Sequence, residues 1–156
     1  MNPVQRQRHT SPRMVTKPFS DRFMFPSRTI SLAINWPWAE LYAFLSNPQT
    51  INRWTQGLFP TPLSPVTDHT WRTLYDGEEV IIAFTPANPF GVLDVELIWT
   101  DKPPRHYVAR LFPNGEASEL CCTIIQRPGE SDAAFASECE WVRIDLDILK
   151  TYIESL

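Results

Sequence analysis

Three polar side chains in the second half of the chain could together support acid/base chemistry. Two adjacent strands are expected around the turn Asn114-Gly115, and counting outward from that turn places Arg110 opposite Glu119. His106 then lies on the same face. A carboxylate or an imidazole can remove a proton alpha to a carbonyl, and an arginine can stabilise the resulting enolate oxygen. Such a set could catalyse an aldol-type cyclisation or a dehydration.

The face on which these groups lie decides whether they can act. The opposite face of the same two strands is the more apolar, with Tyr107, Ala109, Leu111, Leu120, Cys122 and Ile124. If that face is the core, Arg110 and Glu119 form a solvent-exposed pair that contributes at most about 1 kcal/mol and needs no function. The alternative, in which the polar groups lie inside a cavity, stays open.

A second pair of carboxylates, Asp94 and Glu96, also shares one strand face. The opposite face of that strand is a better candidate for the core, because it carries Leu93, Val95, Leu97 and Trp99. We therefore expect both carboxylates to be solvated.

Other kinds of site have no support. The cysteines (Cys121, Cys122 and Cys139) and the scattered histidines (His9, His69 and His106) match neither a disulfide framework nor a zinc pattern. The glycines make no phosphate-binding loop. We expect reduced cysteines that pack in the core, no metal and no cofactor. The net charge of −4, with acidic and basic residues interspersed, argues against nucleic-acid binding.

Length and composition predict one domain. A chain of 156 residues with 43% hydrophobic content can build a single core. No run of about 18 apolar residues could span a membrane, and no secretory signal opens the chain. We expect a soluble, cytoplasmic protein that is a monomer or a homodimer.

Residues 1–27 differ in composition from the rest of the chain. They contain four prolines, five Arg or Lys residues and a single acid, and lack apolar periodicity until Phe23. A disordered extension followed by a domain over 28–156 is the preferred interpretation. An organellar transit peptide and a true start at Met14 or Met24 are alternatives.

From Arg28 onward the pattern indicates a strand, two short helices and a run of strands. Alternation predicts the first strand through Ile34, helical spacing predicts a helix over 38–45, and a second short helix ends near Trp54. Prolines limit 57–68 to a loop or an irregular edge strand. The next strands are expected at 70–75, 79–85, 92–100, 106–112 and 116–126. Because short turns join them, they must be antiparallel neighbours.

The last element has the clearest signal. Ser131 can cap a helix whose apolar residues recur every three or four positions, namely Phe135, Cys139, Val142, Leu146, Leu149 and Ile153. A helix with one continuous apolar stripe must lay that stripe on the sheet. The fold class is therefore α+β, with a curved antiparallel sheet wrapped around a long C-terminal helix.

Several segments resemble one known superfamily. The opening RTISLAINWPWAELYAFLSNPQTINRW (28–54), the motif NPFGVLD (88–94), the stretch 113–132 and the ending DLDILKTYIES resemble small bacterial polyketide cyclase/dehydrase-like members of the START/Bet v 1-like (SRPBCC) superfamily. The resemblance covers nearly everything after Thr29 and implies a helix-grip fold. The group commonly has a histidine after the NPFGVLD aspartate, where this chain has Val95.

The helix-grip arrangement tends to leave an apolar cavity beneath the long helix. The predicted function is binding of a small hydrophobic or aromatic molecule there. The alternative is a cofactor-independent cyclase or dehydratase that uses Arg110, Glu119 and His106. The candidate lining residues are aromatic, with the loop 86–91 as a possible lip: Trp54, Phe84, Phe90, Trp99, Phe112, Trp141 and Tyr152. Each could instead simply pack in the core.

Overall fold

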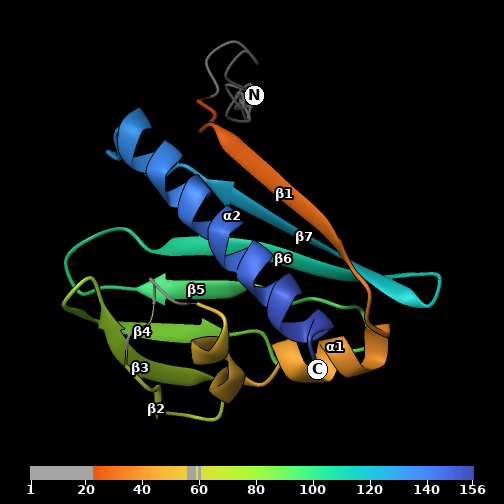
Figure 1. Cartoon of the computed structure of the whole chain (residues 1–156). Coiled ribbons are helices and arrows are strands. Elements are labelled where there is room, and N and C mark those ends of the chain that lie inside the picture. The colour runs from red at the N-terminus through yellow and green to blue at the C-terminus, as the bar shows by residue number, and fades with distance from the viewer. Residues whose placement is uncertain (1–22, 56–58, 60) are drawn as a thin grey trace, which may run out of the picture.

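Within the part of the chain that the computed structural model describes, residues 23–55, 59 and 61–156, seven strands form one antiparallel sheet. Their order across the sheet is β1-β7-β6-β5-β4-β3-β2 (Figure 1). The strands are β1 (Ser27–Ile34), β2 (Ser64–Pro65), β3 (Thr70–Tyr75), β4 (Glu78–Phe84), β5 (Val95–Ile98), β6 (Arg105–Asn114) and β7 (Ala117–Ile125). The helices are α1 (Trp38–Leu45), the 3-10 helix η2 (Pro48–Arg53) and α2 (Asp132–Glu154).

This order confirms the expected helix-grip architecture. Among the described residues of the proline-rich segment 57–68, the regular structure is the two-residue edge strand β2. The strand expected over 92–100 is shorter, because β5 covers Val95–Ile98 and Val92 pairs with Arg110 through an isolated bridge. The predicted extension lies almost wholly outside the described residues, and β1 begins at Ser27.

The hairpin turns set the register of the sheet, and one differs from the expectation. Asp76 and Gly77, at φ of 51° and 79°, form the two-residue turn between β3 and β4 that their sequence predicts. Between β6 and β7, however, Asn114 pairs with Ala117. The expected Arg110–Glu119 pairing is therefore wrong by two residues. A slip of two residues preserves the face of every side chain, because the period of a strand is two.

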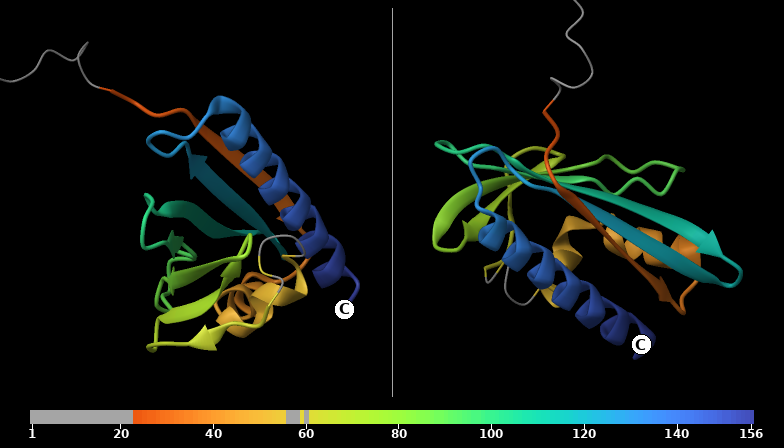
Figure 2. Two further views of the ribbon diagram at one scale, coloured as in Figure 1. Left: turned by 90° about the vertical axis from the view of Figure 1, so that its left-hand side faces the viewer. Right: turned by 90° about the horizontal axis from the view of Figure 1, so that it is seen from above.

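Helix α2 lies across one side of the sheet, the same side as α1 (Figures 1 and 2). The Ser131 side chain accepts a hydrogen bond from the backbone N–H of Ala134 at 3.1 Å, which confirms the predicted cap. All six residues of the predicted apolar stripe are buried. The long helix is therefore held by its packing on the sheet.

The core has two parts that meet below the middle of α2. One part joins α1, α2, β1, β6 and β7, and includes Leu41, Leu111 and Leu146. The other fills the space over β3, β4 and β5, and includes Ile82 and Leu97. The core residues of the first part are Ile34, Leu41, Leu111, Leu120, Cys122, Ile124, Phe135, Cys139, Val142, Leu146, Leu149 and Ile153, and those of the second are Ile51, Phe59, Val80, Ile82, Leu97 and Trp99.

Two aromatic side chains, Trp54 and Tyr107, pack against both parts of the core. They therefore mark the junction at which a space can remain. Over the described residues, neither α1 nor α2 combines the length and apolar character of a membrane-spanning helix.

Candidate functional site

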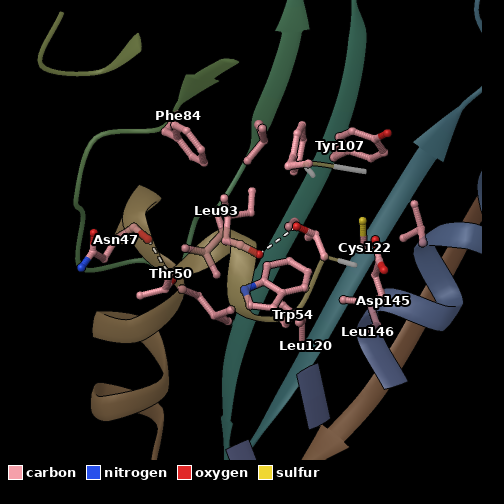
Figure 3. A pocket seen from close by; sticks show the side chains of 17 residues that line it. Asn47, Thr50, Trp54, Phe84, Leu93, Tyr107, Leu120, Cys122, Asp145 and Leu146 are labelled. Carbon is pink, nitrogen blue, oxygen red and sulfur yellow. Dashed lines mark hydrogen bonds between the residues drawn. The ribbon is translucent and has the colours of Figure 1, made fainter. Parts of the chain in front are cut away.

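A cavity of about 110 Å³ lies at this junction, between α2, η2 and the inner face of the sheet (Figure 3). Its walls come from both parts of the core. The lining residues are Leu45, Asn47, Thr50, Ile51, Trp54, Thr55, Phe59, Phe84, Leu93, Val95, Tyr107, Ala109, Leu120, Cys122, Val142, Asp145 and Leu146. Because most of these side chains are apolar, the cavity favours an apolar occupant.

Short-range hydrogen bonds fix the η2 side of the wall. The Asn47 side chain accepts from the backbone N–H of Gln49 at 3.1 Å and starts the helix, with Pro48 in its first position. The Thr50 hydroxyl donates to the Phe44 carbonyl at 2.8 Å, and the Thr55 hydroxyl donates to the Ile51 carbonyl at the same distance. Trp54 is thereby held between two anchored threonines.

The polar groups of the wall are few. Cys122 projects from β7, and burial, followed by the nearby Asp94 charge, raises the pKa of its thiol to about 12. It is therefore a neutral packing residue at physiological pH, with no thiolate to act as nucleophile. Asp145, on α2, is 2% exposed and is the one carboxyl among the lining residues.

A polar clasp of Tyr75, Tyr107 and Glu138 lies beside the cavity, whose wall includes Tyr107. The Tyr107 hydroxyl donates to Glu138 Oε1, and the Tyr75 hydroxyl donates to Glu138 Oε2 at 3.1 Å. Burial and the Glu138 carboxylate both raise the pKa of Tyr107 well above its ordinary value, and the same causes raise the pKa of Tyr75. Both hydroxyls therefore stay protonated and hold α2 against β3 and β6.

A structured loop joins β4 to β5, and residues 86–91, the possible lip, are not among the residues that line the cavity. The Asn88 side-chain oxygen accepts from the backbone N–H groups of Phe90 and Val92 at 3.0 and 3.1 Å, and its amide donates to Val92 O at 3.0 Å. Gly91 has φ of 70°, and a Cβ there would lie 2.1 Å from the Leu111 carbonyl oxygen. The NPFGVLD motif thus builds a tight loop against β6, next to the cavity wall at Leu93.

Comparison with solved structures identifies this architecture. No family model and no curated protein matches the chain. A START superfamily protein from Mycobacterium smegmatis superposes with a TM-score of 0.67 at 11% identity, over 83% of this chain and 97% of that one. CalU16 from Micromonospora echinospora gives 0.61 at 18% identity, over 81% and 73%. Ara h 8.0201 gives 0.62 at 9% identity, over 84% and 99%.

The chain has the helix-grip fold of the START/Bet v 1-like superfamily. At identities this low the likeness establishes the fold and leaves the activity to be argued from the site.

The helix-grip sheet places the three predicted catalytic residues on its outer face, away from α2. Arg110 pairs with the carboxylate of Asp94, and His106 Nε2 lies 3.5 Å from Glu96 Oε1. Glu119 stands across from Phe112 on that face. The hypothesis that these groups converge inside the cavity is therefore wrong, because strand alternation turns the neighbouring Tyr107 and Ala109 inward instead. The solvated placement expected for Asp94 and Glu96 is confirmed.

Of the seven aromatic candidates, Trp54 and Phe84 line the cavity of the helix-grip fold. Three others are exposed outside it: Phe90 by 77%, Phe112 by 47% and Trp141 by 49%. Phe90 sits at a loop tip, Phe112 shares the outer strand face, and Trp141 falls beside the buried stripe of α2.

The remaining two aromatic candidates are core or helix-packing residues. Trp99 is buried edge-on against Tyr75, with ring centroids 5.5 Å apart. Tyr152 packs on Phe44 at 5.8 Å. Both belong to the scaffold around the cavity, outside its lining.

Sequence reasoning missed several lining residues that had a usable signal. Val142 and Leu146 lie on the apolar stripe that places α2 on the sheet. Asp145 lies three residues after Val142 and four before Leu149, so that it is a carboxyl on the buried face of the helix. Glu138 has the same spacing, three residues after Phe135 and four before Val142, and it bonds Tyr75 and Tyr107, so the spacing marks two inward acidic residues, of which Asp145 is the buried one.

Proposed function

We propose that this protein binds a small hydrophobic or aromatic molecule in the cavity between the sheet and α2. The observation that supports this most is the cavity itself, about 110 Å³ lined by side chains of both core parts. A well-packed core leaves few voids larger than a water molecule. A void of this size beneath the closing helix therefore favours a role in binding.

The size of the cavity favours a small ligand. An apolar protein cavity of about 150 Å³ is enough to hold benzene. At about 110 Å³ this cavity is smaller than that, so it holds at most a single ring or a short aliphatic chain unless its wall moves. Ligands of drug size occupy pockets of roughly 300 Å³ or more, so they would have to displace α2 or the loop at 85–94.

The test is native mass spectrometry of gently purified protein, with release and identification of any retained small molecule, on the wild type and two matched variants. Ala109→Leu adds three heavy atoms inside the cavity, whereas Ala83→Leu adds them on the outer face of β4. We expect a retained apolar ligand in the wild type and in A83L, and its loss in A109L. Equal retention by A109L and the wild type would overturn the proposal.

A second candidate function is a cyclase- or dehydratase-like enzyme that acts on a carbonyl compound in the same cavity. The observation that favours it is Asp145, since a carboxyl in an apolar wall is a possible general base. In this candidate mechanism Asp145 is the general base, in place of the outer-face residues Arg110, Glu119 and His106. Asp145→Asn should abolish turnover of a carbonyl substrate while a non-reacting apolar ligand is still bound. Unchanged turnover would remove this candidate.

A further inference from the structure

Among the described residues that line the cavity, one buried side-chain N–H or O–H donor has no acceptor. The hydroxyl protons of Thr50 and Thr55 already go to backbone carbonyls, and that of Tyr107 goes to Glu138. The indole Nε1 of Trp54 is buried and donates to nothing among the described residues. A buried donor left without an acceptor costs about 1–3 kcal/mol. Because Trp54 lines the cavity, a ligand there is one source of the missing acceptor.

The carboxyl group of Asp145 in the wall and the volume of the cavity restrict the acceptor that a ligand can carry. A ligand carboxylate would share the cavity with Asp145, and two carboxyl groups in an apolar space cannot both hold a charge cheaply. A neutral oxygen avoids this repulsion. The volume of about 110 Å³ limits the rest of the ligand to about one ring.

We infer that the cavity takes a neutral single-ring aromatic compound with one oxygen substituent, of the phenol class, and that the indole N–H of Trp54 donates a hydrogen bond to that oxygen. This rests on the proposed binding function and names its ligand chemistry. Trp54 would then determine specificity, because it distinguishes an oxygenated ring from a hydrocarbon ring of the same size.

The chain supplies its own control for this inference. The indole nitrogens of Trp71 and Trp99 are likewise buried without an acceptor among the described residues. Neither residue lines the cavity. A ligand that is recognised by Trp54 should leave these two indole groups unaffected, whereas a general effect on buried tryptophans would change all three.

The experiment uses the full chain labelled with 15N, whose six tryptophans give separate indole N–H signals. Phenol and toluene, which have the same number of heavy atoms, are titrated into the wild type, Trp54→Phe and Trp99→Phe. We expect phenol, and not toluene, to move the Trp54 indole proton downfield. We also expect W54F to lower the phenol-to-toluene affinity ratio by about fivefold, with W99F unchanged.

The outcomes separate this inference from the proposed function. If both compounds bind but phenol leaves the Trp54 indole signal in place, a water satisfies the donor and the inference is overturned while the binding function stands. The same holds if the affinity ratio survives W54F. If neither compound binds the wild type, both fail. Should W54F not fold, the wild-type indole signal still decides the question.

Discussion

The hydroxyl of Tyr42 on α1 accepts a hydrogen bond from the backbone N–H of Asn88 at 2.8 Å, which ties the loop between β4 and β5 to this helix. Tyr42 stacks on Trp38, with ring centroids 5.2 Å apart. The Trp38 indole in turn donates to the Leu111 carbonyl at 2.9 Å. One aromatic pair therefore joins α1 to both the loop and β6.

Removing this hydrogen bond should loosen the loop between β4 and β5. We expect Tyr42→Phe to speed hydrogen exchange at the Asn88 amide about fivefold, since a net hydrogen bond is worth about 1 kcal/mol. Exchange monitored by NMR checks this. Tyr152→Phe, which changes a tyrosine of α2, is the control and should leave Asn88 exchange as it is. Equal exchange in wild type and Y42F would contradict the role of the tie.

A side chain at position 91 should destabilise the fold much more than a side chain at position 77. Gly91→Ala should lower the free energy of unfolding by about 3 kcal/mol or more, because its Cβ would meet the Leu111 carbonyl oxygen at 2.1 Å. Gly77→Ala meets nothing within 4 Å and should cost only the left-handed backbone strain, about 1 kcal/mol. Urea denaturation measures both. Similar losses in the two variants would show that the close approach to Leu111 is not limiting.

The tyrosine clasp predicts a loss of stability at alkaline pH. Burial and Glu138 raise the pKa values of Tyr75 and Tyr107 above the ordinary value of 10.0. The folded protein then keeps protons that the unfolded chain releases, so this stability is fully present below pH 10 and is lost as the pH rises above it.

Chemical denaturation between pH 9 and pH 11.5 follows this loss. The free energy of unfolding should decline in the wild type and decline less steeply in Tyr107→Phe, which removes one of the two titrating hydroxyls. Parallel curves for the two proteins would refute the assignment of the decline to Tyr107.

Two arginines on the same strand should respond very differently to truncation. Arg105 is 2% exposed and pairs with the buried side chain of Glu130. Arg105→Ala should cost about 3 kcal/mol, because it leaves that carboxylate with Arg127, 3.5 Å away, as its remaining cation. Arg110 pairs with Asp94 on the outer face, with both side chains more than a third exposed, and Arg110→Ala should cost less than about 1 kcal/mol. Thermal unfolding compares them. A large loss in R110A would indicate a role that the outer-face pairing does not explain.

The local patterns that predicted the fold depend on neighbouring residues alone. The stripe of α2, its Ser131 cap and the Asp76-Gly77 turn are short-range signals, and all three are confirmed. The partner of Arg110 was mispredicted because Asn114-Gly115 and Gly115-Glu116 are both acceptable turns, and only the packed sheet selects between them.

The cavity could not be predicted from local patterns, because its wall is made by elements that are far apart in the sequence. Trp54 and Phe84 meet Val142 and Leu146 only once α2 crosses the sheet at a particular angle. Phe112 shares strand parity with Arg110, so the assignment of that face to the outside of the sheet also excludes Phe112 from the cavity. Asp145 was overlooked because the apolar stripe of α2 was read for its hydrophobic members alone.

The most direct test of the central claim is a titration of methyl-labelled protein with benzene, followed by NMR in the wild type and in Ala109→Leu. The account predicts saturable shifts confined to methyl groups that line the cavity, above all those of Val142 and Leu146, and their absence in A109L. Shifts that persist in A109L, or that never saturate in the wild type, would contradict the claim that this cavity is a binding site.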